Sequence, residues 1–471
     1  MKRGSHQTRS PWIPVRLKYW LYWQGCGCRS GEASTEIGAR PPGAELFKHG
    51  LRVEQELETV VTSTALQKRA AQDRCPGVLV LHEAADGWLA RVRVPGGRLS
   101  ATKLRALAAA AEQLGSGLID ITARANLQLR GLEQASAPEL AERLRRAELL
   151  PSWQHDRARN VLAGPLAGRS RAALDDVDEL VALLDSRICD APALSALSGR
   201  FCFLVDDGSG AGWEVGPDVT ISARGAGRFS VLLDGQPLGF EGDAAAAAEL
   251  ATRAAEAFLE MRGEERAWRL AEVAGGARAV AERLGLGLGA RRPARPASAV
   301  GPGVALQRDG RSAVTALTPL GQLWPGLLRE LAALCELADT DVRISPQRTI
   351  TVVDLDADAV TATSAALQRA GLELDAASGW VGLTACAGVG ACANALADVR
   401  AAAALRARTR SAGAPTEHWT ACGRRCGEGS ATAVAVAVEA PGRVAIRHDT
   451  RAWTEPTLDA ARDRLDTEAV R

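Results

Sequence analysis

The chain has 471 residues, and its 57 lysines and arginines nearly balance 56 aspartates and glutamates, leaving a net charge of +1. This balance excludes the overall basic field that holds a protein on nucleic acid, although a local basic cavity is compatible with it. Hydrophobic residues make up 46% of the chain, and no apolar run is long enough to span a membrane. We expect a cytoplasmic, globular protein of about three domains, with no nucleic-acid or membrane partner.

Ten cysteines in a chain expected in the cytoplasm point to metal or redox chemistry rather than to disulfides. Residues 1–70 have no sustained periodicity, and their Cys26-Gly27-Cys28 pair lacks a second pair that would complete a zinc site. The sequence therefore predicts a disordered N-terminal extension over residues 1–70.

Periodic segments begin after Cys75. Alternation and helical spacing predict a strand, a helix and a second strand, at Trp88–Val94, Leu99–Leu114 and Leu118–Leu129. The second strand would place Arg124, Asn126 and Gln128 on one face, because side chains two apart in a strand point the same way.

The same pattern returns 223 positions later, where Asp309-Gly310 matches Asp86-Gly87 and Ile344–Val352 matches Ile121–Leu129. This repetition predicts an internal duplication of a strand–helix–strand unit of the ferredoxin-like kind. We expect residues 86–132 to lie beside residues 309–355. The first copy would keep its polar face for a ligand, and the second copy would be structural.

Between the copies, Phe201–Val205 and Trp213–Ser222 predict two strands of a hairpin around the turn Asp206–Gly212. The Gly208-x-Gly210-x-Gly212 run within this turn is similar to a nucleotide-binding loop. A strand rather than a helix follows it, however, so no helix N-terminus would face a phosphate, and a hairpin turn is the preferred interpretation.

Four of the cysteines fall in two close pairs, Cys386-x5-Cys392 and Cys422-x3-Cys426. Four soft thiolates in two close pairs, the first of them among small residues, favour a [4Fe–4S] cluster. The alternatives are a structural zinc site, which prefers two to four intervening residues in each pair, and four reduced cysteines without a metal. We also expect Cys392 to open a helix over Ala393–Arg406, whose N-terminal dipole would favour a negative cluster.

Two cysteine pairs after a duplicated ferredoxin-like unit resemble the siroheme-dependent nitrite and sulfite reductase superfamily, from about residue 71 to about residue 455. Within it, the sequence is most similar to the precorrin-3B synthase branch. The segments that carry this resemblance are Cys75-Pro76-Gly77, Arg91–Gly97, Thr122–Gln128, Arg159-Asn160-Val161, Pro165–Gly168 and Arg200–Asp207.

The resemblance implies an α+β fold with two ferredoxin-like half-domains and two α/β hemoprotein-like domains. The expected divisions are the extension 1–70, the first half-domain 71–135, the first reductase-like α/β domain 136–284, a linker 285–303, the second half-domain 304–358 and the cluster domain 359–471. An internal duplication already supplies the symmetry of a dimer, so we expect a monomer.

The resemblance also implies a tetrapyrrole site. In the reductases two arginines, matching Arg124 and Arg159, accompany two lysines that deliver protons; here Arg200 and Cys202 occupy the lysine positions. We expect Arg124, Arg159 and Arg200 to be catalytic, and a larger set to bind the carboxylates of a tetrapyrrole: Arg91, Arg93, Arg124, Asn126, Gln128, Arg159 and Arg200. Cys426 matches the cysteine that bridges the cluster and the macrocycle iron.

For this branch the resemblance implies an iron–sulfur monooxygenase of aerobic cobalamin biosynthesis. Its substrate would be precorrin-3A, hydroxylated at C20 with formation of a γ-lactone, using O2 and a reduced nicotinamide. The implied oxygen-activating centre includes a mononuclear non-haem iron, for which the sequence offers no convincing ligand set. No dinucleotide-binding motif is present, so electrons would come from a partner reductase or ferredoxin. The alternatives are a siroheme-dependent nitrite or sulfite reductase, and a non-catalytic electron-transfer or tetrapyrrole-binding protein.

Overall fold

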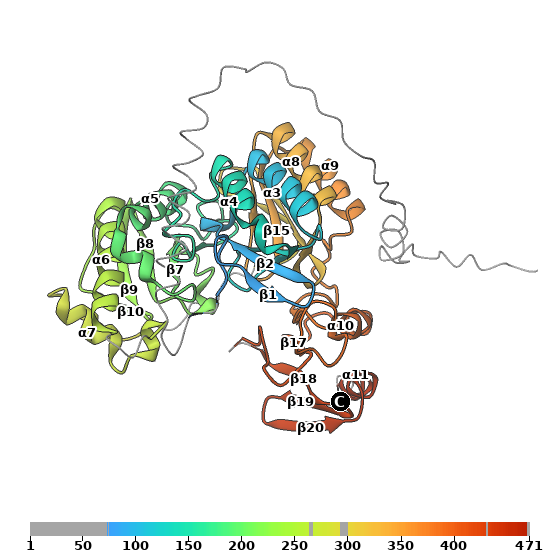
Figure 1. The fold of residues 1–471 in the computed structure, drawn as a ribbon. Coiled ribbons are helices and arrows are strands. Elements are labelled where there is room, and N and C mark those ends of the chain that lie inside the picture. The colour runs from blue at the N-terminus through green and yellow to red at the C-terminus, as the bar shows by residue number, and fades with distance from the viewer. Residues whose placement is uncertain (1–72, 74, 263–266, 293–299, 430–431, 469–471) are drawn as a thin grey trace, which may run out of the picture. The chain divides into compact units, whose positions relative to one another are not determined.

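The computed structural model describes residues 73, 75–262, 267–292, 300–429 and 432–468 (Figure 1). The predicted extension over residues 1–70, with Cys26 and Cys28, lies outside the described residues. So does residue range 293–299 of the predicted linker. The described elements form four five-stranded sheets.

The first half-domain is built around a sheet of strand order β1-β2-β5-β4-β13. Its helix α3 begins where the Ser100 hydroxyl accepts a hydrogen bond from the Lys103 N–H, and it ends before Gly115. The elements of this half are β1 (His82–Ala84), β2 (Gly87–Val92), η1 (Pro95–Gly97), β3 (Arg98–Leu99), α3 (Ala101–Leu114), β4 (Ile119–Ile121), β5 (Leu127–Leu132), η2 (Gln134–Ser136) and α4 (Ala137–Arg146).

The prediction of one strand over Leu118–Leu129 is wrong, because the segment forms two antiparallel strands, β4 and β5, joined by a tight turn. Within the turn the Ala125 N–H donates to the Thr122 carbonyl, and Ala125 takes a left-handed φ of 49°. Alternation continues across the turn in the sequence, which hides the reversal. Arg124 therefore lies in the turn and not on a strand face with Gln128.

The second half-domain repeats the first, with strand order β11-β12-β15-β14-β3. The turn between its two central strands has the same hydrogen bond, from the Arg348 N–H to the Ser345 carbonyl, and Arg348 has a φ of 62°. The elements of this half are β11 (Gly303–Leu306), β12 (Ser312–Leu317), η6 (Pro319–Gly321), β13 (Gln322–Leu323), α8 (Pro325–Ala338), β14 (Val342–Ile344), β15 (Thr349–Leu355) and α9 (Ala357–Arg369).

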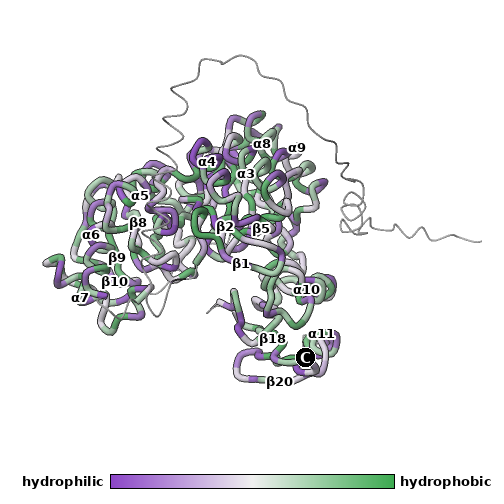
Figure 2. Tube along the Cα trace, viewed as in Figure 1, coloured by the Kyte–Doolittle hydropathy of each residue, from purple (hydrophilic) through white to green (hydrophobic). Residues whose placement is uncertain are grey.

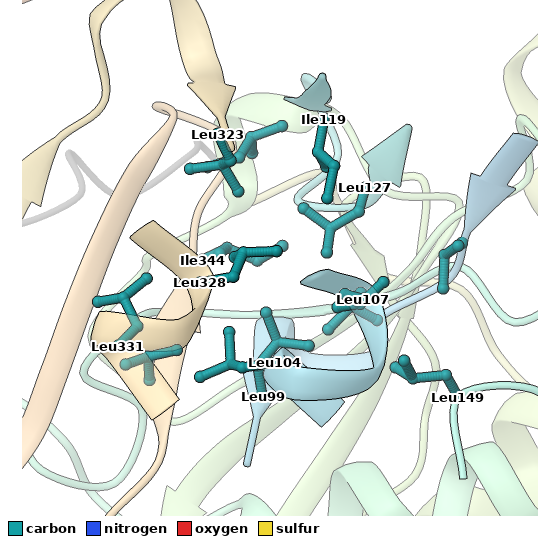
Figure 3. Close-up of a cluster of buried hydrophobic side chains, with 14 of the residues drawn as sticks. Leu99, Leu104, Leu107, Ile119, Leu127, Leu149, Leu323, Leu328, Leu331 and Ile344 are labelled. Carbon is teal, nitrogen blue, oxygen red and sulfur yellow. The ribbon is translucent and has the colours of Figure 1, made fainter. Parts of the chain in front are cut away.

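The two half-domains exchange a strand. β13 from the second copy pairs with β4 of the first, and β3 from the first copy pairs with β14 of the second. Helices α3 and α8 pack against each other over one shared core, where leucines and isoleucines of both copies point toward one another (Figure 3). The predicted duplication, with its copies side by side, is confirmed.

The first α/β domain has three parallel strands, β6, β7 and β8, followed by two antiparallel ones. The hairpin prediction is wrong, because β7 and β8 run parallel and the glycine run lies in the crossover between them. The elements are β6 (Val161–Ala163), α5 (Asp178–Asp190), η3 (Pro192–Ala196), β7 (Phe203–Asp206), η4 (Trp213–Val215), β8 (Val219–Gly225), β9 (Arg228–Leu233), β10 (Gln236–Pro237), α6 (Ala244–Met261), η5 (Leu270–Glu272) and α7 (Gly276–Arg283).

The second α/β domain has the same topology: β16, β17 and β18 are parallel, and β19 and β20 follow antiparallel. The duplication therefore extends over both parts of each half. The elements are β16 (Leu383–Ala385), α10 (Val399–Ala407), β17 (Glu417–Thr420), β18 (Val434–Ala440), β19 (Arg443–His448), β20 (Arg451–Glu455) and α11 (Leu458–Glu468).

Among the described residues, no helix is both long enough and apolar enough to cross a membrane. Figure 2 shows hydrophilic positions interrupting the hydrophobic ones along the helices. The run of alanines at the start of α6 belongs to an amphipathic helix, whose apolar side packs on β8 and β9.

Two leucines of α8 provide a direct test of the shared core. Leu331 is buried between the copies, whereas Leu337 is 84% exposed. Leu331→Ala should lower the free energy of unfolding by about 2–5 kcal/mol, because it opens a cavity that cannot collapse. Leu337→Ala should change it by less than about 0.5 kcal/mol. Chemical denaturation followed by circular dichroism measures both, and equal losses would contradict the shared core.

Candidate functional site

One face of the first sheet carries a row of polar side chains. The strand ladders place Arg91 opposite Gln128, Gln128 opposite Asp120, and Asp120 opposite Gln322 of the exchanged strand. Arg91 donates from Nη2 to Gln128 Oε1 at 3.1 Å. The opposite face of the same strands holds the aliphatic core, so polar groups on this row are separated from it by the sheet itself.

Three guanidinium groups near this row have unmet hydrogen-bonding capacity. The Nε atoms of Arg91, Arg93 and Arg124 are buried without a partner among the described residues. Burial, together with the neighbouring guanidinium groups, lowers the pKa of Arg91, and it lowers that of Arg93 to about 10. Crowded cations of this kind are costly unless an anion binds among them.

The nearest carboxylates are already occupied by other donors. Asp73 accepts from the Ser198 hydroxyl at 2.8 Å and from the Gly199 N–H at 2.7 Å. Asp156 accepts from the Val78 N–H at 2.6 Å. No described carboxylate forms an ion pair with Arg91, Arg93 or Arg124, so the surplus positive charge remains available to a ligand.

Asn126 is occupied inside the protein. Its Oδ1 accepts from the Val94 N–H at 3.2 Å, and its Nδ2 donates to Asn160 Oδ1 at 2.8 Å. These bonds hold the turn that presents Arg124 against the start of the first α/β domain. The geometry gives Asn126 a positioning role.

Arg159 differs from Arg91, Arg93 and Arg124 because its Nε atom has a hydrogen-bond partner. It donates to both carboxylate oxygens of Asp185, at 2.8 and 2.7 Å, and to the Leu149 carbonyl at 2.9 Å. All of its nitrogens have partners in this state. Arg93 and Arg159 nevertheless line one charged cavity of about 330 Å³, whose other walls include η1 and α5.

Arg200 and Cys202 occupy two different environments. The Arg200 guanidinium stacks over the Trp268 ring, 4.5 Å from its centroid, on the exposed surface. Cys202 is fully buried, and burial raises the pKa of its thiol to about 12. Neither side chain is suited to release a proton near neutral pH.

The cysteine pairs converge for a topological reason. Cys386 follows β16 and Cys422 follows β17, and these strands are parallel neighbours, so the loops at their carboxyl ends meet. The Ala421 N–H donates to Cys386 Sγ at 3.3 Å. Burial and the three other thiols, Cys422, Cys386 and Cys392, raise the pKa of Cys426. The structure therefore brings Cys426 within electrostatic reach of the other three cysteines.

The start of the helix predicted over Ala393–Arg406 is wrong. Helix α10 begins at Val399, where Asp398 caps it by accepting from the Ala401 N–H. Cys392 lies in the preceding loop, with its N–H on the Gly388 carbonyl. The cap residue, and not the cysteine, stops the helix from extending toward the N-terminus.

His418 braces the second cysteine pair. Its Nδ1 lies 2.6 Å from the Thr384 hydroxyl and its Nε2 lies 3.0 Å from the Cys426 carbonyl. Burial lowers the pKa of His418 to about 4. The neutral ring then donates from Nε2 to the Cys426 carbonyl and accepts at Nδ1 from the Thr384 hydroxyl, so both ring nitrogens are used in hydrogen bonds.

The described residues contain no group of three or more His, Cys, Asp or Glu side chains close enough to hold one metal ion. Zinc or mononuclear iron would need such a single-ion site. A [4Fe–4S] cube takes one cysteine on each of four irons, and so needs the thiols around a larger volume.

The first half has the same two loops without cysteines. Where the second half has its cysteine pairs, the loops after β6 and β7 are bonded to each other directly, by the Gly168 N–H on Asp207 Oδ2 at 2.9 Å. Asp206 accepts from the N–H groups of Gly208 and Gly210, which explains the glycine run as a carboxylate-bonded turn.

Known proteins resemble this chain in the same regions. The family profile described as "Nitrite/Sulfite reductase ferredoxin-like half domain" matches it twice, at residues 82–147 and 305–370, which are the two copies seen in the fold. Two segments of the chain thus match the nitrite/sulfite reductase ferredoxin-like half-domain.

Individual relatives match shorter parts. A precorrin-3B synthase of Sinorhizobium sp is 49% identical over 75 residues, which are 16% of each chain. A ferredoxin–nitrite reductase of Synechococcus elongatus is 41% identical over 107 residues, covering 22% of this chain and 21% of the relative. One from Leptolyngbya laminosa is 32% identical over 164 residues, covering 33% and 32%. The chain thus matches between about a sixth and a third of the length of these curated relatives.

A solved structure, the NirA protein of Mycobacterium tuberculosis, has the same fold. It superposes with a TM-score of 0.66 over 80% of this chain and 79% of that one, at 20% sequence identity. The duplicated α+β fold predicted from the sequence is confirmed.

Sequence reasoning missed three residues around the site: Asp185, Asp120 and Arg400. They act through contacts between segments that are apart in the chain, for example Asp120 with Arg400, and no local motif marks them.

The contrast between free and paired arginines predicts opposite effects on stability. Arg124→Met should raise the free energy of unfolding by about 1–3 kcal/mol, because it removes an uncompensated cation from a crowded site. Arg159→Met should lower it by about 3–5 kcal/mol, because it leaves Asp185 unpaired. Thermal unfolding of the ligand-free protein distinguishes the two, and destabilisation by both variants would argue against a surplus of charge.

Proposed function

We propose that this protein is an oxidoreductase whose substrate is a polycarboxylate tetrapyrrole, bound on the arginine-lined face of the first half-domain. The observation that carries this proposal is the set of three buried Nε atoms, on Arg91, Arg93 and Arg124, with no partner among the described residues. A macrocycle edged with acetate and propionate groups supplies several carboxylates, and bidentate guanidinium groups suit them. Arg200, held flat on Trp268, would add a contact at the rim.

The proposed reaction is that of precorrin-3B synthase: hydroxylation of precorrin-3A at C20 with closure of a γ-lactone. One atom of O2 enters the macrocycle and the other leaves as water, with two electrons from a reduced nicotinamide through a partner protein. The 49% identity to a precorrin-3B synthase supports this choice over 75 residues. In this account the arginines bind and orient the carboxylates, and the aliphatic face of the sheet keeps water from beneath them.

Cys386, Cys392, Cys422 and Cys426 would hold a [4Fe–4S] cluster. Their chemistry fits it: four thiols converge from two loops, and the five-residue interval of the first pair exceeds the spacing usual for zinc. When bound, such a cluster supplies single-electron transfer. A mononuclear iron does not fit in the same way, since the described residues offer no set of three ligands for it, and no step is assigned to one.

A second candidate is a siroheme-dependent nitrite or sulfite reductase. The matches to two ferredoxin–nitrite reductases and the fold of NirA favour it. Arg200 and Cys202 argue against it, because the two lysine positions of the reductases would here hold a guanidinium and a buried thiol of pKa about 12. A site that protonates a small oxyanion needs acids that release protons at neutral pH. A non-catalytic tetrapyrrole-binding or electron-transfer protein is the remaining alternative.

Turnover tests the choice of substrate. Protein with NADH, a ferredoxin reductase and ferredoxin as electron donors should convert precorrin-3A under 18O2 to a product that retains one labelled oxygen atom, and should not consume nitrite or sulfite. Arg93→Met should raise KM for precorrin-3A by about tenfold or more, as expected for one lost charge-assisted hydrogen bond. Reduction of nitrite without conversion of precorrin-3A would move the assignment to the reductases.

Substitution of single cysteines tests the cluster. Cys386→Ser and Cys426→Ser should each lower iron well below the four atoms per chain expected for a cube and weaken the broad visible absorption. Cys189→Ser is the matched control, since Cys189 is also partly exposed but lies on α5, away from the four cysteines. Iron analysis checks this, and equal iron in all three variants would contradict the ligand assignment.

A further inference from the structure

Two arginines tie the first cysteine loop to the first half-domain. Arg400 on α10 donates from Nε to the Cys386 carbonyl at 3.1 Å and from Nη2 to Asp120 Oδ1 at 3.0 Å. Arg130 on β5 donates to the Ala391 carbonyl at 2.6 Å, and its guanidinium is held by both oxygens of Asp86. We call Asp120, Arg130 and Arg400 the loop clamp.

The loop clamp acts next to both cysteines of the first pair. It grips the carbonyl of Cys386 itself and that of Ala391, the residue before Cys392. Arg130 is 2% exposed and Asp120 is 8% exposed, so these charges lie largely out of water. Charge-assisted bonds in such surroundings are stronger and more directional than exposed ones.

The equivalent loop of the first half is fastened differently. There Arg169 belongs to the loop itself and pairs with Asp354 on β15 and with Asp178. Arg343, which stands in the second sheet where Asp120 stands in the first, also pairs with Asp178. In the half without cysteines, the loop thus carries its own arginine, which pairs with carboxylates. In the half with cysteines, arginines from other elements donate hydrogen bonds to the carbonyls of a small-residue loop.

We propose that the loop clamp positions Cys386 and Cys392 as cluster ligands and raises the reduction potential of the cluster. This inference rests on the proposed function, in which these cysteines hold a [4Fe–4S] cluster. Reduction adds one negative charge to the cluster, and buried cations beside it favour the reduced form. Asp120 opposes this effect electrostatically while it holds Arg400 in place.

Asp120 of the loop clamp is also a member of the polar row that carries the proposed substrate site. Asp120 is the cross-strand neighbour of Gln128, and Gln128 binds Arg91. Asp120, Arg130 and Arg400 are therefore positioning residues between the arginine-lined face and the cysteine loop, and none of them is required to touch substrate.

Two substitutions of opposite charge test the proposal. Arg400→Gln should shift the midpoint potential of the cluster to a more negative value, because a cation is lost. Asp120→Asn should shift it to a more positive value, because an anion is lost. The measurement is a redox titration of the full chain with dithionite, followed by EPR. Shifts in the same direction, or no shift in either variant, would overturn the electrostatic part of the proposal.

Arg400→Lys tests positioning separately, since it keeps the charge and loses the fork that joins Cys386 to Asp120. It should lower iron retention per chain at least twofold during desalting, at unchanged circular dichroism. Full retention with the wild-type EPR line shape would overturn the positioning role. If the Arg400→Gln variant binds no iron although its circular dichroism matches that of the wild type, the loss of iron supports the positioning role. Asp120→Asn then tests the effect on the midpoint potential.

The matched control is Arg169→Gln, which breaks the corresponding network of the half without cysteines. It should leave the midpoint potential unchanged, and a shift equal to that of Arg400→Gln would overturn the proposal. Wild-type protein with neither iron nor a reduced EPR signal would overturn the proposed cluster itself. If the wild type gives a reduced-cluster EPR signal and the loop-clamp variants keep its midpoint potential and iron content, the role of the loop clamp is overturned and the proposed cluster is not.

Discussion

The exchange of short strands between the two half-domains is the constraint on which the rest of the structure depends. β13 completes the first sheet and β3 completes the second, so neither sheet is whole without the other copy. Because a ladder fixes register, the exchange also fixes which face of each sheet is polar. α3 and α8 then close one core over the aliphatic faces, and the opposite faces remain available for charged groups.

The two copies of the duplicated unit differ in the side chains of their polar rows. At equivalent positions of the two polar rows, the first sheet carries Arg91, Gln128, Asp120 and Gln322, and the second carries Thr315, Thr351, Arg343 and Arg98. In the second row the threonines bond to each other and Arg343 is paired with Asp178. Arg343 thus has a carboxylate partner, as expected for a structural copy, although its Nε atom is buried without a hydrogen-bond partner, whereas Arg91 has no carboxylate partner among the described residues.

The two α/β domains also differ from each other in the side chains of their equivalent loops. The loops after β6 and β7 are bonded to each other by aspartates, and the corresponding loops after β16 and β17 carry the cysteines. The first cysteine loop, residues 386–392, has no charged side chain of its own. The arginines that hold it therefore come from β5 and α10, which joins the proposed cluster site to the arginine-lined face.

The sequence contained the duplication and the cysteine pairs, because both are repetitions or spacings within short segments. It could not reveal the turn at Ala125 or the parallel pairing of β7 and β8, since alternation persists through the turn and a crossover has no local signature. The roles of Arg159 and Asn126 were also hidden, as they depend on Asp185 and Asn160, which only folding brings near.

The central claim is that the tetrapyrrole is a substrate and the cysteines hold a cluster. Optical and EPR spectra of protein purified without oxygen, before and after dithionite, test it most directly. The account predicts a broad brown absorption without sharp macrocycle bands and a reduced-cluster EPR signal. Intense Soret-like and red bands of bound siroheme would contradict the substrate assignment, and a colourless protein that contains zinc would contradict the cluster.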